Sequence, residues 1–317
     1  MSIYIPQDTT ALALGAEAVA RVLQAAGVEP VRNGSRGLFW LEPLLEVDTE
    51  DGRIGFGPVT NKDIPGILDA LETDASSHHL YLGQVEKIEY LASQQRLTYA
   101  RAGLGDPVCL DNYQALNGFV GLSNALQMDG QQIVDQVKDS GLRGRGGAAF
   151  PAGIKWQTVL DCDSEQKYIV CNADEGDSGT FADRLVMEAD PYQLIEGMTV
   201  AGLAVGANQG YIYLRSEYPV AHKLLNIAIE RAVEANFLGD NIQGSGKTFH
   251  LEVRLGAGAY ICGEETSLLD SLEGKRGMVR AKPPLPAIEG LFGKPTVVNN
   301  VLTLAAISTI LEQGAEA

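Results

Sequence analysis

A run of small residues at positions 144–153 constrains this chain more than any other segment. It reads Gly-Arg-Gly-Gly-Ala-Ala-Phe-Pro-Ala-Gly, and Lys155 follows closely. Glycine and alanine carry little or no side chain, so such a backbone can lie flat against a ligand. The spacing Gly144-x-Gly146-x-x-Ala149 also matches the dinucleotide fingerprint, which needs a strand before it. Residues 131–140 instead carry apolar residues at helical spacing. We therefore predict a nucleotide-binding loop that is not of the Rossmann kind.

Length and charge restrict the class of protein. A chain of 317 residues suits two domains. With 24 Lys and Arg against 41 Asp and Glu, the surface should repel phosphate backbones, so we expect no nucleic-acid partner. An anionic cofactor must then be held by backbone N–H groups, helix N-termini or a few placed cations. We find no apolar run long enough for a bilayer and no signal peptide at the start, and we expect no membrane insertion.

The cysteines and histidines do not form a metal-binding pattern. The four cysteines are widely spread and contain no C-x-x-C pair: Cys109, Cys162, Cys171 and Cys262. This spacing is poor for zinc or an iron–sulfur cluster, and the cysteines are too few for a disulfide scaffold. Free thiols in a reducing compartment are expected, which predicts a cytoplasmic protein without a metal site. We interpret His78 and His79 as solvated residues.

The pattern of strands and helices predicts two domains of the α/β class. Residues 1–75 read as strand, helix, hairpin and helix, an order that suits a thioredoxin-like unit. Residues 76–107 begin with a polar, turn-prone stretch and are expected to be a linker. Residues 108–317 alternate helices and strands, as in a Rossmann-like α/β domain. The expected strands there are 167–171, 210–215 and 249–255, and the expected helices are 188–207, 221–235, 266–272 and 301–311.

Four loops of the second domain carry residues suited to binding, most of them at the end of a strand or the start of a helix. Ligands gather at such places in α/β folds. The loops are the glycine loop with Lys155, residues 172–177 (Asn-Ala-Asp-Glu-Gly-Asp), residues 256–265 (Gly-Ala-Gly-Ala-Tyr-Ile-Cys-Gly-Glu-Glu) and residues 298–300 (Val-Asn-Asn). Each loop alone also fits ordinary turns, helix caps or charges that complement a helix dipole. The occurrence of all four in one domain indicates a ligand site.

A second glycine-rich stretch is misleading. Residues 244–248 read Gly-Ser-Gly-Lys-Thr, which resembles a phosphate loop. The first glycine of that motif would fall on Asn241, and no strand precedes the stretch. We predict a turn that leads into the strand near Phe249.

At these four loops the chain resembles the flavin-bearing, NADH-oxidising subunit of respiratory complex I. The same type of subunit serves NAD-reducing hydrogenases and NAD-dependent formate dehydrogenases. The resemblance covers about residues 112–317 and rests on several long motifs in the same order. The run 33–43 (Asn-Gly-Ser-Arg-Gly-Leu-Phe-Trp-Leu-Glu-Pro) resembles the thioredoxin-like ferredoxin partner of this family, which holds a [2Fe–2S] cluster on four cysteines. No cysteine precedes Cys109 here, so the unit is expected to lack the cluster.

A cluster-free unit fused to a flavin subunit is most similar to the β subunit of molybdenum-containing, NAD-dependent formate dehydrogenase. That resemblance implies a thioredoxin-like [2Fe–2S] subunit and a catalytic iron–sulfur/molybdenum subunit as partners. In the family, a ubiquitin-like domain and a helical domain with a [4Fe–4S] cluster follow the flavin domain. Neither is expected within these 317 residues.

The resemblance also implies roles for the residues of the four loops. FMN would lie among them, with its phosphate at Val298, Asn299, Asn300 and Thr303. Lys155, Asn172 and Asp174 would fix the ribityl chain and ring edge, and Tyr260, Gly263, Glu264 and Glu265 would line the other side. NAD(H) would stack near Gly146, Gly147 and Phe150, and Gly144 and Arg145 would also belong to the cofactor-binding residues. Glu175 or Asp177, with Glu265, would serve catalysis by contacting its amide or ribose groups, and Lys282 would reach its pyrophosphate or adenosine end.

The implied reaction is hydride exchange between the nicotinamide and the flavin, with electrons passing to or from iron–sulfur clusters. Geometry rather than an acid–base pair would then do most of the catalytic work. Reduction of NAD with electrons from formate is the expected direction. The same module could instead serve a hydrogenase or complex I. A non-catalytic flavin-binding docking subunit and a flavin enzyme that reduces a small acceptor such as a quinone also remain open.

Overall fold

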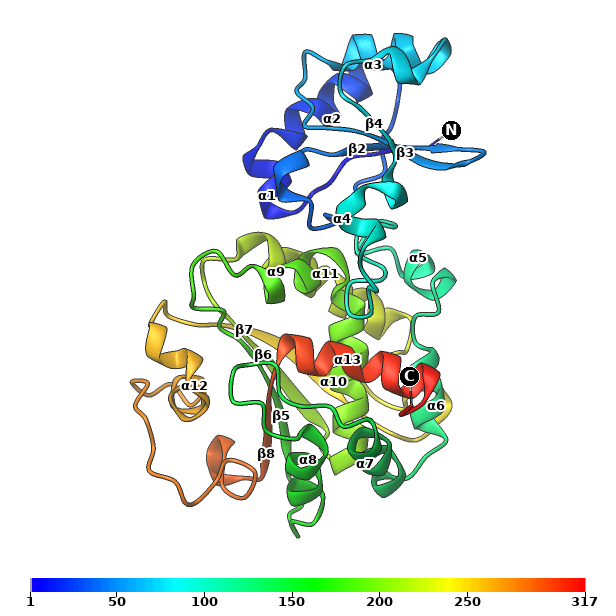
Figure 1. Ribbon diagram of the computed structural model, residues 1–317. Coiled ribbons are helices and arrows are strands. Elements are labelled where there is room, and N and C mark those ends of the chain that lie inside the picture. The colour runs from blue at the N-terminus through cyan, green and yellow to red at the C-terminus, as the bar shows by residue number, and fades with distance from the viewer. Residues whose placement is uncertain (1, 317) are drawn as a thin grey trace. The chain divides into compact units, whose positions relative to one another are not determined.

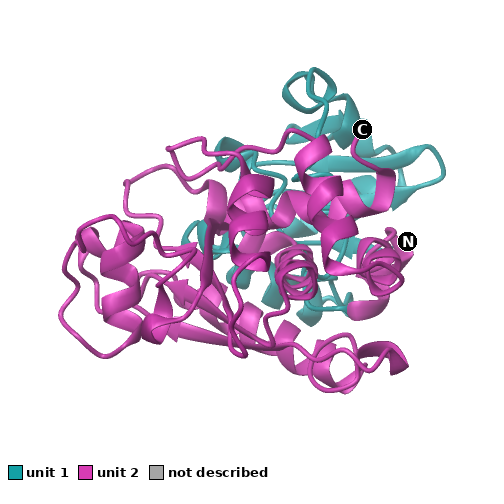
Figure 2. Ribbon diagram, turned by 90° about the horizontal axis from the view of Figure 1, so that it is seen from below, with its two compact units in different colours: residues 1–109 teal, residues 110–317 magenta. Residues whose placement is uncertain are grey.

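The structure is a computed structural model that describes residues 2–316, and its chain divides into two compact units (Figure 2). Unit 1 extends to Cys109 and unit 2 begins at Leu110. The segment expected as a linker, residues 76–107, belongs to unit 1. It contributes strand β4 (Tyr81–Gln84), which pairs with the strand before it. The polar composition of this segment hid a four-residue strand that is only partly buried.

Unit 1 is built around one sheet of four strands. Its antiparallel sheet has the order β1-β2-β3-β4, with β1 at Ile3–Tyr4, β2 at Leu45–Thr49 and β3 at Gly52–Phe56. Val31, which lies outside the named strands, forms an isolated parallel bridge with Tyr4. Residues 2–108 of this unit contain no cysteine, so no cysteine can hold a cluster there.

The helices of unit 1 pack on the apolar side chains of this sheet. The first helix expected in residues 1–75 is two helices, α1 (Thr9–Ala13) and α2 (Ala16–Ala25), because Gly15 between them has φ +106°. The later helices are α3 (Ile64–Glu72) and α4 (Glu89–Ala92). Short 3-10 turns lie at η1 (Phe39–Leu41), η2 (Ala75–Ser77) and η3 (Val85–Lys87).

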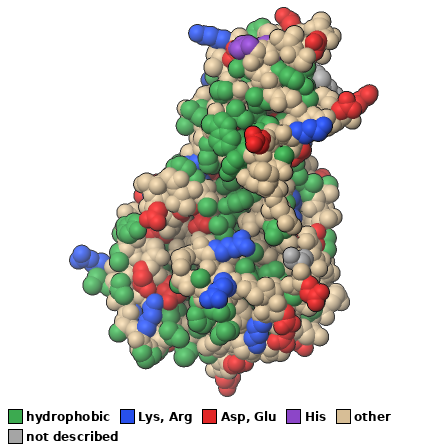
Figure 3. All heavy atoms as spheres, viewed as in Figure 1, with side chains coloured by type: hydrophobic (Ala, Val, Ile, Leu, Met, Phe, Trp, Pro, Cys, Tyr) green, Lys and Arg blue, Asp and Glu red, His purple; other side chains and the backbone are tan. Residues whose placement is uncertain are grey.

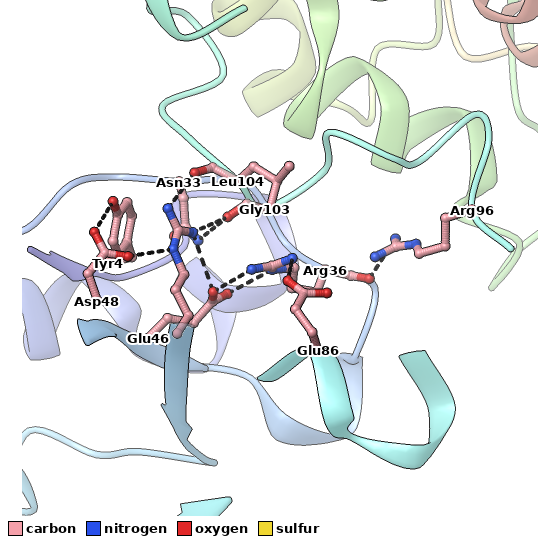
Figure 4. A network of polar contacts seen from close by, with 10 residues as sticks. Tyr4, Asn33, Arg36, Glu46, Asp48, Glu86, Arg96, Gly103 and Leu104 are labelled. Carbon is pink, nitrogen blue, oxygen red and sulfur yellow. Dashed lines mark hydrogen bonds and ion pairs between the residues drawn. The ribbon is translucent and has the colours of Figure 1, made fainter. Parts of the chain in front are cut away.

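A buried network of charges joins the end of unit 1 to its sheet (Figure 4). Arg36 and Glu46 form an ion pair of 2.7 Å, with side chains 2% and 0% exposed. Arg53 also pairs with Glu46 and donates hydrogen bonds to the carbonyl oxygens of Gly103 and Leu104. A buried charge is tolerated when it is paired and hydrogen-bonded. The network therefore ties residues 103 and 104 to the sheet of unit 1.

Unit 2 is built on a parallel sheet of four strands in the order β7-β6-β5-β8 (Figure 1). The strands are β5 (Tyr168–Ala173), β6 (Gln209–Leu214), β7 (His250–Leu255) and β8 (Thr296–Asn300). The first three match the sequence prediction. The fourth was expected only as a loop that opens the last helix, because β8 ends in two asparagines and runs directly into helix α13 (Val301–Gln313).

Helices cover both faces of this sheet. Helices α8, α10 and α13 pack on one face, while α12 and η6 (Leu291–Gly293) pack on the other around Val170, Leu268 and Val298. Asp190 separates α9 from α10, so the helix expected at 188–207 spans the end of α9 and all of α10. The helices are α5 (Leu110–Ala115), α6 (Val120–Leu126), α7 (Gly130–Asp139), α8 (Ala152–Leu160), α9 (Ala182–Ala189), α10 (Pro191–Val205), α11 (Pro219–Glu234), α12 (Glu265–Leu272) and α13 (Val301–Gln313), with short turns η4 (Ile242–Gly244) and η5 (Tyr260–Gly263).

The stretch that resembles a phosphate loop has a structural role. The ammonium of Lys247 donates hydrogen bonds to the carbonyl oxygens of Leu126 at 3.2 Å and Met128 at 2.9 Å. These carbonyls lie at the end of α6, where a cation also complements the helix dipole. Lys247 is therefore used to close a helix of its own chain.

The basic side chains and the thiols of the described residues are dispersed. On the face shown in Figure 3, Lys and Arg side chains are separated by other residues and form no continuous basic surface. All four cysteines are free thiols. Within residues 2–316, no helix is long and apolar enough to cross a membrane. The same residues contain no group of three or more His, Cys, Asp or Glu placed to hold a metal ion.

Candidate functional site

The candidate site lies where the strand order of unit 2 reverses direction. From β5 the chain proceeds to β6 and β7 on one side, whereas β8 adds to the other side of β5. In such sheets, ligands bind beyond the carboxyl ends of the strands at this switch point. The parallel register places Cys171 beside Asn299 and Asn172 beside Asn300. The second and fourth loops, which are far apart in the sequence, therefore leave the sheet side by side.

The glycine loop is attached to the start of α13. It joins α7 to α8, so a helix and not a strand precedes it, as the sequence predicted. The backbone N–H of Arg145 donates to the hydroxyl of Thr303 at 2.9 Å. A Cβ atom added to Gly146 would lie 3.1 Å from the Cβ of Asn300, so a side chain at 146 would crowd the cap of α13. Gly147 has φ +104°, a conformation that favours glycine.

The fourth loop combines buried and partly accessible groups. Asn299 is 6% exposed and accepts a hydrogen bond from the indole nitrogen of Trp156 at 2.9 Å. Asn300 caps α13 by accepting from the backbone N–H of Leu302. The carbonyl of Val298 accepts from the ammonium of Lys155 at 2.7 Å. The residues expected at an FMN phosphate are thus gathered around the N-terminus of a thirteen-residue helix.

Glu175 differs from what the sequence suggested. Its side chain is buried, with 8% exposed, and accepts four hydrogen bonds from its own chain. Three come from the backbone N–H groups of Ala182, Asp183 and Arg184 at the start of α9, and the fourth from the hydroxyl of Tyr218 at 2.9 Å. The carboxylate closes the N-terminus of α9, so its lone pairs are largely used inside the protein.

Asp174, the neighbour of Glu175, is half-buried at the carboxyl end of β5. Burial raises the pKa of Asp174 to about 6, although the nearby guanidinium of Arg215 acts to lower it. Its backbone N–H donates to the side-chain oxygen of Asn172 at 3.2 Å. A carboxyl group that has lost part of its hydration is suited to accept hydrogen bonds from a ligand.

The third loop is joined to the second. The side-chain amide of Asn172 donates to the carbonyl of Gly263 at 2.8 Å. The ring of Tyr260 lies against Gly176, where an added Cβ would be 2.8 Å from a ring carbon, and its hydroxyl donates to Asp177 at 3.0 Å. Tyr260 is 72% exposed and Phe150 is 51% exposed. Each offers an aromatic face to solvent.

Two lysines supply positive charge on this acidic chain. Burial lowers the pKa of Lys155, and its ammonium lies 3.8 Å from a carboxylate oxygen of Glu265. Lys282 pairs with Glu264 at 3.0 Å and with Glu265 at 2.7 Å. Burial acts against the charge of Lys282, but these two carboxylates outweigh it and raise its pKa. Glu264 also caps α12 by accepting from the N–H groups of Thr266 and Ser267.

The structure therefore brings the four loops together by direct contacts. It also adds two side chains that the sequence did not single out. Trp156 holds Asn299, and Asp183, at the start of α9, accepts a hydrogen bond from the side-chain amide of Asn300 at 2.7 Å. An acidic residue in the first turn of a helix is commonplace, so no sequence signal distinguishes Asp183.

Comparison with known proteins agrees with this geometry. Residues 137–309, more than half of the chain, match the family described as the Nuo51 FMN-binding domain. The chain belongs to this family.

Curated relatives include an NADP-reducing hydrogenase subunit, HndC, of Solidesulfovibrio fructosivorans. It is 52% identical over 223 residues, which cover 70% of this chain and 45% of the relative. An NADH-quinone oxidoreductase subunit of Aquifex aeolicus is 51% identical over 207 residues, covering 65% of this chain and 48% of the relative. This chain thus spans about half the length of these relatives.

Among solved structures, an NAD+-reducing [NiFe]-hydrogenase in the H2-reduced state is similar to this chain. The matched region covers 99% of this chain and 53% of the hydrogenase chain. The two share a TM-score of 0.58 and 29% sequence identity. Because nearly the whole chain is covered, the similarity includes unit 1 as well as unit 2. The α/β fold with a parallel sheet in unit 2 is therefore shared with this class of oxidoreductase.

Proposed function

We propose that this chain is a diaphorase module that binds FMN at the β5–β8 switch point and exchanges hydride between NAD(H) and the flavin. The observation that carries the proposal is the joining of four separate loops at one edge of the parallel sheet. Family membership and the names of the relatives support it. Bound FMN supplies a two-electron acceptor for hydride that can release electrons singly to iron–sulfur clusters.

The residues at the switch point fit FMN. The N-terminus of α13 and the ammonium of Lys155 offer positive charge to the phosphate on a chain of net charge −17. The N-terminus of α13, capped by Asn300, would hold the phosphate end, with Val298 and the buried Asn299 and Thr303 shaping the strand and helix beneath it. Asn172 and Asp174 would hold the ribityl chain and ring edge. Gly263, with Glu264 and Glu265, would close the opposite side.

The outer part of the site suits NAD(H). Gly144, Arg145, Gly146 and Gly147 would give the stacked rings a flat wall, with Phe150 and Tyr260 as exposed aromatic faces. Asp177 and Glu265 would contact the amide or ribose groups, and Lys282 would exchange its carboxylate partners for the pyrophosphate. We assign Glu175 to holding α9 and Tyr218, because four internal hydrogen bonds occupy its carboxylate.

The rest of the electron path lies in other subunits. We propose a thioredoxin-like [2Fe–2S] subunit and a molybdenum-containing, iron–sulfur catalytic subunit as partners, with formate as the electron donor for NAD reduction. The four free thiols fit a cytoplasmic location. The names of the relatives favour a second candidate, the same module in a hydrogen-oxidising or quinone-reducing enzyme.

Anaerobic titration with NADH tests the diaphorase proposal. The 317-residue chain is loaded with FMN, and the flavin absorbance near 450 nm, roughly where oxidised flavins absorb, is followed as NADH is added. Stoichiometric bleaching is expected, with turnover when an artificial acceptor is present. Bound flavin that NADH does not bleach would indicate a docking subunit instead. Rapid quinone turnover by the isolated chain would indicate a quinone reductase.

The electron donor is tested on the full complex purified from its host. NAD reduction that depends on formate, and not on hydrogen, is the expected result. Hydrogen-dependent reduction, or quinone-dependent oxidation of NADH, would replace formate by the corresponding substrate and leave the diaphorase assignment intact.

A further inference from the structure

The side chain of Asn300 uses both ends of its amide. Its nitrogen donates to a carboxylate oxygen of Asp183 at 2.7 Å, and its oxygen accepts from the backbone N–H of Leu302 at 2.9 Å. The second bond is the N-cap of α13. An amide placed the other way round would direct its NH2 group at the Leu302 donor and lose the cap.

Asp183 and the Leu302 N–H favour the same orientation of the Asn300 amide. An ionised carboxylate can only accept hydrogen bonds, so it attracts the NH2 group of Asn300 and repels the oxygen. Asp183 is 4% exposed and sits in the first turn of α9, where its own backbone N–H donates to Glu175 at 3.0 Å. Its position is thus fixed by the same carboxylate that closes α9.

The same contact reaches the glycine loop. The Cβ of Asn300 lies 3.1 Å from the position that a Cβ on Gly146 would occupy, so Asn300 forms the surface on which this loop rests. Asn300 also stands beside Asn172 in the β5–β8 register. Through Asn300, Asp183 connects the second loop, the glycine loop and the start of α13.

We propose that Asp183 is a positioning residue for the flavin: its carboxylate holds Asn300 in the orientation that caps α13 at the FMN phosphate. This inference rests on the proposed function, because it assumes that the phosphate binds there. Asp183 itself is buried beneath Asn300 and needs no contact with the ligand.

The charge of Asp183 should matter near neutral pH. Burial raises the pKa of Asp183 to about 7, the carboxylate of Glu175 adds to this, and the hydrogen bond from Asn300 acts to lower it. The titratable groups near it are Glu175 on the loop after β5 and Cys171 on β5, a thiol whose pKa burial raises well above its ordinary value. When protonated, Asp183 can donate to the oxygen of a flipped Asn300 amide. The backbone N–H of Leu302 then loses its acceptor. The cap is therefore firmest above pH 7.

The test is FMN affinity as a function of pH, measured by quenching of flavin fluorescence. The variants are Asp183→Asn, whose amide can also donate to the Asn300 oxygen, and Asp139→Asn, which removes an exposed charge at the end of α7. At pH 8, Asp183→Asn should bind FMN about tenfold more weakly than wild type, a size typical of a lost cap and charge-assisted bond. The ratio should shrink severalfold by pH 6. The phosphate's own ionisation cancels in this ratio, and Asp139→Asn should bind as wild type at every pH.

A second variant keeps the inference testable if Asp183→Asn does not fold. Serine caps helices without an orienting partner. The FMN affinity of Asn300→Ser should therefore depend less on pH than that of wild type. Adding Asp183→Asn to this variant should change its FMN affinity less than twofold. Two results would overturn the inference while leaving FMN binding intact. One is a ratio of wild-type to Asp183→Asn FMN affinity that is constant with pH. The other is an equal effect of Asp183→Asn on FMN affinity in wild type and in Asn300→Ser. A wild-type chain that does not bind FMN would overturn the proposed function and this inference with it.

Discussion

Glu175 offers a direct test of how the structure uses its second loop. Replacement by glutamine keeps the shape of the side chain but turns one acceptor oxygen into an NH2 donor. Two of its four bonds, those from Ala182 and Asp183 to one oxygen, can survive. In the wild-type protein, the other oxygen accepts from the N–H of Arg184 and the hydroxyl of Tyr218. The hydroxyl can rotate and accept from the new amide, but the Arg184 N–H would face another donor.

The expected cost follows from these bonds. A hydrogen bond to a buried charged group contributes about 1.5–3 kcal/mol, and a helix cap about 1 kcal/mol. Loss of the charge and of one acceptor should therefore lower the free energy of unfolding of unit 2 by about 2–3 kcal/mol. Asp177→Asn is the matched control, since it makes the same chemical change on the same loop. Asp177 is exposed and accepts one hydrogen bond, from Tyr260, so little change is expected.

The chain contains two tryptophans, which makes the assay specific to one unit. Trp40 lies in unit 1 and Trp156 is fully buried in unit 2. In a Trp40→Phe background, tryptophan emission during urea unfolding of the FMN-free protein reports unit 2 alone. A Glu175→Gln variant that unfolds like its parent but does not bind NADH would contradict the structural role of Glu175, because the carboxylate would then act on the ligand.

Two further predictions concern Lys155 and Asp174. Lys155→Met removes a charge that is hydrogen-bonded to β8, so it should weaken FMN binding at least about tenfold. Flavin fluorescence quenching measures this affinity. Unchanged affinity would exclude a phosphate or ring-edge contact for this lysine. Burial raises the pKa of Asp174 from 3.8 to about 6, so the folded protein should lose stability as pH rises from about 4 to about 6. Asp174→Asn should remove this component in urea unfolding of the FMN-free protein, and parallel pH profiles for both proteins would contradict it.

Several elements could be predicted because their signal is local. Residues 168–173 and 250–255 form strands where apolar residues run between turns, and Pro191 marks the start of α10. Strands β4 and β8 were missed for a local reason as well. One is short and only partly buried, and the other ends in two asparagines that also read as a helix cap. Their pairing partners, β3 and β5, are what make them strands.

Short segments of the sequence predict the α/β class of the second unit and four candidate binding loops. Glycine spacing, the asparagines before the last helix and the lysines are properties of short segments, and they predict a surface for an anionic nucleotide on an acidic chain. Only the tertiary structure decided what each polar side chain does. Glu175 and Asp177 are two residues apart, yet one is buried against α9 and Tyr218 and the other is exposed beside Tyr260. Burial and hydrogen-bond partners come from segments far away in the chain, and these separate a carboxylate that holds the fold from one that is available to a ligand.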